Sequence, residues 1–428
     1  MEKLRFFRVS KDTVHDAVAE ISSSRKPLEY YVEVVRRIVE EVKTRGDAAL
    51  IGYVKRFDSP HVSLENLRVP REQMLRAYTN LDERTRKALR KSAENIAKLS
   101  QTQLNRLNIK KKIEEGVLVL QRPSPLPSVG CYVPGGAAAY PSTALMTVVP
   151  AKVANVPRKV VCTPPDREGK ISDIVLAALH VAGADEVYAV GGAHAIAAMA
   201  YGTETIKPVS KVLGPGGPFV TAAKKIVGCD VLVDMLAGPT ELLVYGDDVG
   251  DAEDVALEMC AQAEHSEDTF VGLVTTSDEL VNEVLKFIKL ITPRLERRET
   301  IEKALEKNGY FVVCDTVKTA ITFIQSIAPE HLYIPSRHEK ITPFITNAGL
   351  ISAGKHTSPT LCDYVAGVNH VLPTSGQATI RGGLNIIDYV KIVTEVRIMK
   401  GAAKRLGKYA AILAKAEGLT AHAAAASK

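Results

Sequence analysis

Apolar residues recur every three or four positions through much of residues 1–115, the spacing of amphipathic helices. The segment YYVEVVRRIVEEVKTRG carries a stripe of branched aliphatic residues and ends at Gly46, a residue suited to cap a helix. The basic run at 84–112 has a similar stripe that includes Leu89 and Ile96. We therefore expect a mainly helical scaffold here, with the basic side chains on a solvated face.

From Val117 the pattern changes to short β-branched runs (VLVL, KVVC, EVYAV and DVLV) separated by Gly/Pro turns and alanine-rich helical stretches. A second such unit follows. It begins with a helix from Asp251 to His265, followed by a strand at FVGLVTT. A second helix begins at Ser277, followed by a strand at YFVVCD. This alternation predicts an α/β fold with largely parallel sheets.

The C-terminal part has a helical pattern again. We expect helices at NIIDYVKIVTEVRIM and AAKRLGKYAAILAKAEG, with a break at Gly418 before LTAHAAAASK. A small helical appendage of this kind often packs on a partner subunit.

Composition is that of an ordinary globular protein, with 46% hydrophobic and 24% charged residues over 428 residues. The net charge is only +6, and the basic run contains no aromatic residue, which disfavours nucleic-acid binding. The six cysteines show no CxxC spacing, which argues against a thiolate zinc site or a disulfide framework. No stretch has the length of a signal peptide or a membrane span, so we expect a soluble, cytoplasmic protein.

Three glycine-rich turns, at 133–142, 190–202 and 213–225, could approach a phosphate. The turn at 190–202 is the best suited, because it follows a strand and opens a helix whose N–H groups and dipole favour anions. It does not have the GxGxxG pattern. The alternative is that these are tight strand-to-helix turns that need glycine for backbone reasons.

Two Glu-His pairs differ in their surroundings. In AQAEH, Gln262 and His265 lie three positions apart on one face of a predicted helix and offer two donors to a borderline metal such as zinc. Further donors are available in two loop-like, glycine-containing segments: Asp363, His370, Glu417 and His422. Each of these alone is more often a solvated polar residue, so the metal hypothesis requires all of them to converge.

The second pair, in APEHLYIP, has no helical spacing. Glu330 and His331 lie between Pro329 and a strand-like run. A histidine that titrates near neutral pH beside a carboxylate suits general acid/base chemistry. The alternative is a histidine that only caps local structure.

Five segments, DMLAGPTELLV, AQAEH, APEHL, DYVAGVNHVLPTSG and EGLTAHA, resemble the histidinol dehydrogenase family in order and spacing, over nearly the whole chain. The resemblance implies a cytoplasmic homodimer with shared active sites and one zinc ion per subunit. It implies oxidation of L-histidinol through L-histidinal to L-histidine, the last steps of histidine biosynthesis, with two NAD⁺ consumed. Neither nucleic acid nor a membrane is implied as a partner.

The resemblance also assigns residues. The implied zinc ligands are Gln262, His265, Asp363 and His422, the last from the neighbouring subunit. The implied substrate contacts are Thr240, Gln262, His265, His331, Asp363, His370, Glu417 and His422. Glu330 and His331 match the family's catalytic pair, in which the histidine accepts protons and the glutamate helps activate water.

Three residues match the family's NAD contacts: Tyr132, His194 and Gly217. The family usually has glutamine at the position of His194 and asparagine at that of Gly217. The alternative for His194 is a turn-exposed polar residue without a cofactor contact.

The implied fold has two Rossmann-like α/β domains with largely parallel sheets and small helical segments at both ends. The helical segments are residues 1–23 and a tail, 383–428, that contributes to the partner's site. A discontinuous domain of 24–130 and 238–382 carries the metal and catalytic residues. An inserted domain of 131–237 binds NAD.

Two other functions remain open. One is a related zinc- and NAD-dependent dehydrogenase that acts on another small polyol. The other is a zinc- and imidazole-binding sensor that has lost NAD binding, which the residues at 194 and 217 motivate.

Overall fold

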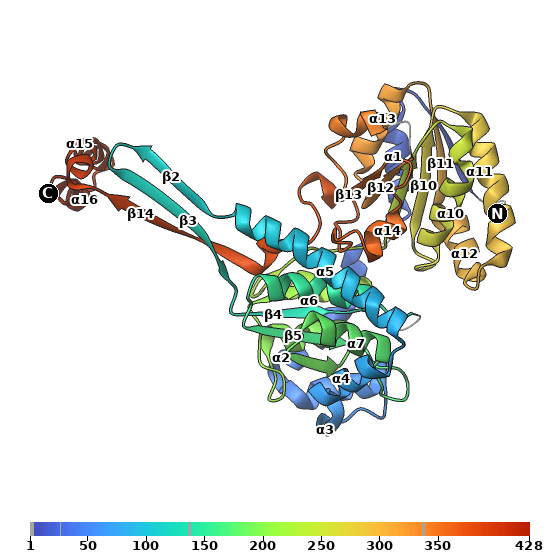
Figure 1. Cartoon of the computed structure of the whole chain (residues 1–428), viewed down its shortest axis with the longest axis horizontal. Helices are drawn as coiled ribbons and strands as arrows, with labels where there is room; N and C mark the ends of the chain where they lie inside the picture. The colour runs from blue at the N-terminus through green and yellow to red at the C-terminus, as the bar shows by residue number, and fades with distance from the viewer. Residues whose placement is uncertain (1–3, 26, 136–137, 336–338) are drawn as a thin grey trace.

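Two open parallel sheets and an antiparallel arm organise the chain in the computed structural model, which describes residues 4–25, 27–135, 138–335 and 339–428. Each parallel sheet is covered by helices, and the arm extends away from them to the C-terminal helices (Figure 1). The predicted α/β class with largely parallel sheets is confirmed.

The first sheet has the order β1-β11-β10-β9-β12-β13, and all its strand pairs are parallel. Its strands are β1 (Arg5–Val9), β9 (Glu241–Tyr245), β10 (Phe270–Thr275), β11 (Gly309–Cys314), β12 (His331–Ile334) and β13 (Leu350–Ala353). Leu242 and Val244 point to one core, whereas Leu243 and Tyr245 point to the other. Burial on both faces explains why these strands read as continuous apolar runs.

Helices cover both faces of the first sheet. Residues of α10 (Ala252–Ala263), α11 (Asp278–Ile291) and α12 (Arg298–Asn308) share the core of Leu242, and those of α1 (Val14–Ser23) and α13 (Val317–Ile327) share the core of Leu243. The helix that Ser277 was predicted to open is confirmed, because the Ser277 hydroxyl accepts a hydrogen bond from the backbone N–H of Leu280.

The second sheet has the order β6-β5-β4-β7-β8 and is also parallel. Its strands are β4 (Ser128–Tyr132), β5 (Arg158–Thr163), β6 (Glu186–Ala189), β7 (Lys211–Leu213) and β8 (Leu232–Val233). Residues of α6 (Pro141–Val153) and α7 (Asp173–Ala182) pack on one face, and those of α8 (Gly192–Tyr201) and α9 (Pro218–Val227) on the other. The strand order reverses between β4 and β7, the place where open α/β sheets bind ligands.

The predicted N-terminal helices form, but they pack differently from the predicted domain division. Helices α2 (Leu28–Tyr53), α4 (Arg71–Asn80) and α5 (Glu83–Arg106) contact α8, α7 and α6 around the second sheet, so residues 28–106 pack mainly there. Helix α5 also bonds to residues 364 and 365. Gly46 interrupts α2 with a φ of 55°, at the predicted helix end. The predicted helical segment 1–23 contains a strand, β1, besides α1.

The arm joins β2 (Ile109–Glu114), β3 (Val117–Pro125) and β14 (Val390–Ile398), with both strand pairs antiparallel. The helix predicted at NIIDYVKIVTEVRIM was therefore wrong: most of that segment is β14. Its β-branched residues suit a strand, and β3 supplies a partner that the sequence pattern does not reveal. The VLVL run lies in β3, which pairs antiparallel with both β2 and β14.

The remaining helices are short or C-terminal. They are the π-helix η1 (Val54–Asp58), α3 (Leu64–Leu67), α14 (Pro359–Tyr364), α15 (Lys400–Ala416), α16 (Thr420–Ala426) and the 3₁₀ turns η2 (Val249–Asp251), η3 (Thr292–Arg294), η4 (Glu339–Phe344), η5 (Gln377–Thr379) and η6 (Ile386–Tyr389).

The turn after β7 generates a stability prediction with an internal control. Gly214 has a φ of +107°, and a Cβ there would collide with the backbone carbonyl oxygen of Tyr132, whereas a Cβ at Gly217 meets nothing within 4 Å. We expect Gly214→Ala to lower the free energy of unfolding by about 2 kcal/mol or more, and Gly217→Ala to change it by about 0.5 kcal/mol or less. Denaturant unfolding of both variants measures this, and equal losses would contradict the described turn.

Candidate active site

Three predicted residues meet where β9 and β12 begin. Thr240 and Glu330 directly precede these paired parallel strands, and Gln262 lies near the end of α10. The Thr240 hydroxyl donates to Glu330 Oε2 at 2.6 Å and accepts from Gln262 Nε2 at 2.8 Å. The backbone N–H of Glu241 donates to the same Oε2 at 2.7 Å. The glutamate carboxyl is thus fixed through one oxygen at the amino-terminal edge of the first sheet.

Burial controls the protonation of Glu330. Its exposed fraction is 6%, and loss of hydration raises its pKa well above the usual range despite the hydrogen bonds from Thr240 and Glu241. A carboxyl group in this environment releases and takes up a proton at higher pH than an exposed one. This behaviour is typical of acid/base groups in active sites.

His331 is neutral for the same physical reason. Its exposed fraction is 3%, and burial, followed by the nearby His370 and His265, lowers its pKa to about 3. Its Nε2 lies 3.7 Å from Asp363 Oδ1, and its Nδ1 has no hydrogen-bond partner. This pKa lies well below the near-neutral value that the acid/base hypothesis expected, although the neutral imidazole keeps a nitrogen that can accept a proton.

Asp363 lies on α14 rather than in the predicted loop. Burial and the Glu258 charge raise the pKa of Asp363 to about 7, and its Oδ1 is buried without a hydrogen-bond partner. Buried polar atoms are nearly always paired in folded proteins, so an unpaired carboxyl oxygen indicates a place where a further group binds.

His265 lies in the turn after α10, which ends at Ala263 instead of continuing to His265. Its Nδ1 is 3.2 Å from the carbonyl oxygen of Gln262. Donation from Nδ1 to a carbonyl leaves Nε2 as the nitrogen able to bind a metal, an arrangement common among metal-binding histidines. The predicted proximity of Gln262 and His265 is retained although the helix is shorter.

His370 connects the two α/β units. Its Nδ1 is 2.9 Å from the backbone carbonyl of Asp363, and its Nε2 is 3.3 Å from the hydroxyl of Thr143. Burial lowers the pKa of His370 to about 4. Thr143 lies in the first turn of α6, which begins at the carboxyl edge of the second sheet. That edge therefore faces the site described above.

Sequence reasoning missed Thr143. Nothing in PSTALM distinguishes it from other threonines near a helix start, and only the approach of the two units brings it to His370.

Glu417 and His422 lie elsewhere in the chain. Glu417 caps the end of α15 and His422 lies on α16, at the far end of the arm, and both are exposed. Figure 1 shows these helices well away from β12 and α14. Within the described part of one chain, no group of three His, Cys, Asp or Glu side chains could hold a metal ion. In one subunit Gln262 bonds to Thr240, whereas His265 and Asp363 lie near His331; His422 is not among them.

The predicted NAD contacts lie at the carboxyl edge of the second sheet. Tyr132 ends β4, and its hydroxyl accepts a hydrogen bond of 3.0 Å from the N–H of Gly192. Gly217 precedes α9 in the turn after β7. Part of the turn at 133–142 lies outside the described residues.

The alternative of an exposed His194 was wrong, since its exposed fraction is 2%. Its Nε2 lies 2.9 Å from Asp58 Oδ2, so the ring points away from solvent into the layer formed by α2 and η1. The cofactor contact of this residue stays a prediction.

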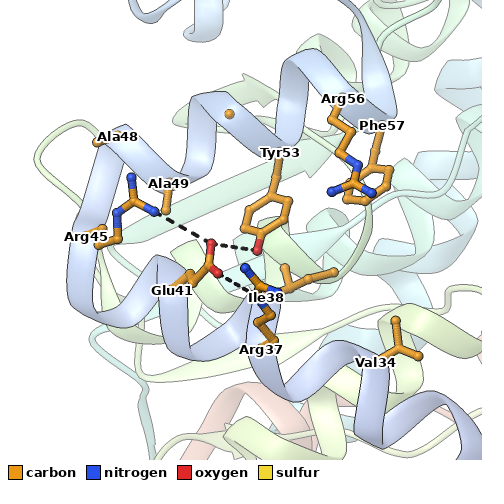
Figure 2. A pocket seen from close by; sticks show the side chains of 11 residues that line it. Val34, Arg37, Ile38, Glu41, Arg45, Ala48, Ala49, Tyr53, Arg56 and Phe57 are labelled. Atoms are coloured by element: carbon orange, nitrogen blue, oxygen red, sulfur yellow. Dashed lines mark hydrogen bonds and ion pairs between the residues drawn. The ribbon is translucent and has the colours of Figure 1, made fainter.

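A surface pocket of about 380 Å³ lies against α2 and η1 (Figure 2), and two of its lining residues, Tyr53 and Phe57, also pack near His194. Within it, Glu41 accepts hydrogen bonds from Arg37 and from Tyr53. None of the predicted site residues lines it.

Comparison with known proteins identifies the family of the chain. The family model described as histidinol dehydrogenase matches residues 22–428. The chain belongs to the histidinol dehydrogenase family. The family prediction and the oxidoreductase class are therefore confirmed.

Similar members of the family come from archaea and bacteria. The histidinol dehydrogenase of Methanothermobacter thermautotrophicus is 44% identical over 91% of both chains, and that of Methanopyrus kandleri is 43% identical over 91% of this chain and 92% of its own. The crystal structure of histidinol dehydrogenase from Elizabethkingia anophelis superposes with a TM-score of 0.91 at 31% identity, covering 99% of this chain and 97% of that one. Among the described residues, no helix is long and apolar enough to cross a membrane.

Proposed function

We propose that this member of the histidinol dehydrogenase family oxidises L-histidinol through L-histidinal to L-histidine, the last steps of histidine biosynthesis, with zinc and NAD as cofactors. The observation that carries the proposal is the buried pair of a neutral His331 and a high-pKa Glu330 beside an unpaired Asp363 oxygen. Family membership adds the substrate, and a cytoplasmic location remains an expectation.

His331 is the proposed base. Its Nε2 faces the space beside Asp363, so it can accept the hydroxyl proton of the alcohol and later that of the aldehyde hydrate. Glu330 is held through Oε2 by Thr240 and Glu241, which leaves Oε1 to orient and deprotonate the water that attacks the aldehyde. When NAD is bound, it supplies the hydride chemistry.

The donor set fits zinc. An amide, an imidazole and a carboxylate are borderline and hard donors that zinc accepts. The buried Oδ1 of Asp363 has no hydrogen-bond partner and is therefore available as a ligand. Gln262, His265 and Asp363 would hold the ion, with His422 of the partner subunit as the fourth ligand. Zinc would orient the imidazole and amine of the substrate there. Thr240, His370 and the partner's Glu417 would complete the substrate contacts.

The second sheet suits NAD. Tyr132 ends β4 and the turn with Gly217 follows β7, so both flank the point where the strand order reverses. The Thr143–His370 contact joins this edge to the proposed substrate site, so a nicotinamide in the crevice would face the group it oxidises.

The arm suits a second copy of the chain. Strand β2 is exposed along its whole length, and large apolar side chains are exposed along the arm and α15: Ile109, Ile113, Ile392, Val396, Ile398, Met399, Tyr409, Ile412, Leu413 and Leu419. A patch of this kind marks an interface. In a two-fold symmetric homodimer it would be covered while each tail carries Glu417 and His422 to the partner's site.

The two other functions, a dehydrogenase of another polyol and a zinc- and imidazole-binding sensor, would require different residues at the site. Oxidation of another polyol would be expected to change Thr240, His370 or Glu417, and all three retain groups that can contact histidinol. A sensor would not need a Glu330 carboxyl fixed by two donors beside a neutral histidine.

Turnover gives the direct test. Purified protein with L-histidinol and excess NAD⁺ should form two NADH per histidinol, because each oxidation transfers one hydride. Absorbance of NADH at the end point measures the ratio. A ratio of one, or oxidation of another polyol without histidinol, would exclude the proposed reaction, and absence of NADH binding would favour the sensor.

Two histidine variants separate the metal from the base. His331→Asn should retain zinc and lose about 10² to 10⁴ in kcat, whereas His265→Asn should lose zinc because it removes a ligand. Zinc per subunit in the purified variants is the measurement. Similar zinc contents in both would contradict the assigned roles.

Mixed subunits test the shared site. Asp363→Ala and His422→Ala homodimers should each be inactive, but a heterodimer has one site with both residues intact. Random mixing should therefore restore about a quarter of wild-type activity. Heterodimers verified by two affinity tags and still inactive would argue against ligation across the interface.

A further inference from the structure

Asp58 is a buried carboxylate to which neither the sequence nor the proposed mechanism gives a role. It ends the π-helix η1, which continues α2, and its side chain is 8% exposed. Its Oδ2 accepts a hydrogen bond of 2.9 Å from the N–H of Gly191 and lies 2.9 Å from His194 Nε2, which donates to it. One carboxylate oxygen from the helical layer thus holds both the start of α8 and a side chain in its first turn.

The turn between β6 and α8 is fixed tightly at this point. A Cβ on Gly191 would come within 2.8 Å of Asp58 Oδ1 and 2.6 Å of Pro164 Cβ, so the backbone lies directly between these residues. The next N–H, that of Gly192, is bound by the Tyr132 hydroxyl. Two successive backbone N–H groups are therefore occupied by side chains and do not form an open anion site.

Aromatic rings close the other side of His194. Tyr53 and Phe57 stack on each other with ring centroids 5.8 Å apart, and their centroids lie 6.0 and 6.2 Å from that of His194. Both also line the surface pocket, where Figure 2 shows them on the helix that leads to Asp58. In the observed orientation of the imidazole, Nε2 meets the carboxylate of Asp58 and the ring packs near Tyr53 and Phe57.

We propose that Asp58 is a positioning residue for NAD. Through Gly191 and His194 it fixes the turn at the carboxyl edge of the second sheet. This turn includes Gly192, whose N–H donates to the Tyr132 hydroxyl. This role rests on the proposed use of NAD at that edge. Asp58 acts through its neighbours and not by contact with the reacting atoms. Its loss should loosen the turn and weaken NAD binding, while the substrate site at the first sheet keeps its geometry.

The test compares Asp58→Ala with Asp58→Asn. The alanine variant removes both interactions, and we expect its Kd for NADH and its KM for NAD⁺ to rise about tenfold or more, since hydrogen bonds to a charged group are involved. KM for histidinol should change less than about twofold. The asparagine variant keeps an acceptor for Gly191, so its Kd should lie between those of the wild type and the alanine variant. Fluorescence titration with NADH and steady-state kinetics give these values.

Asp230→Ala is the matched control. Asp230 belongs to the same unit and, like Asp58, accepts two hydrogen bonds on one oxygen, here from Lys43 and Tyr201. Its side chain is 50% exposed, and it lies just before β8, at the opposite edge of the second sheet. Its replacement should leave the NADH Kd unchanged.

The outcomes separate the two proposals. Failure of the wild type to bind NADH would overturn the proposed function. Normal wild-type binding with an unchanged Kd in folded Asp58→Ala would overturn the role of Asp58, as would an equal rise of KM for NAD⁺ and histidinol. If Asp58→Ala does not fold, Asp58→Asn decides. A several-fold rise of its KM for NAD⁺ with an unchanged KM for histidinol supports the role of Asp58, and an unchanged KM for NAD⁺ overturns it.

Discussion

The parallel register of β9 and β12 is the constraint on which the site depends. His331 pairs with Leu242, so the residues just before the two strands, Thr240 and Glu330, come together at one edge of the first sheet. The hydrogen bonds of Thr240 and the Glu241 N–H to one carboxyl oxygen follow directly from this register. A shift of one residue would turn His331 to the opposite face and separate these groups.

Desolvation then gives the paired residues their chemical properties. Burial disfavours the charged form of any group, so it raises the pKa of Glu330 and lowers that of His331. The neutral imidazole is the form that accepts a proton, and the pKa of the Glu330 carboxyl is raised well above its usual range. One physical effect thus shifts the pKa of both members of this Glu-His pair, whereas in the other pair Glu264 is half-buried and His265 is exposed.

The two sheets contribute opposite edges. The acid/base residues lie at the amino-terminal edge of the first sheet, and the proposed NAD contacts lie at the carboxyl edge of the second. The hydrogen bond between His370 and Thr143 joins these edges. The arm meanwhile places Glu417 and His422 far from this junction in their own subunit, which is the geometric reason for proposing that they serve a partner.

The α/β class, most helices, the family and the residue types at the site can be predicted from the sequence. These follow from local periodicity, from turn residues and from motifs whose members are close in sequence. Tertiary structure decided what depends on distant partners. Strand β14 forms because β3 lies beside it, and α2 to α5 join the second sheet by packing. The contacts of Asp58 with His194 and of Thr143 with His370 each join residues more than a hundred positions apart. Local patterns carry no information about such contacts, because burial and hydrogen-bond partners are set by the assembled fold.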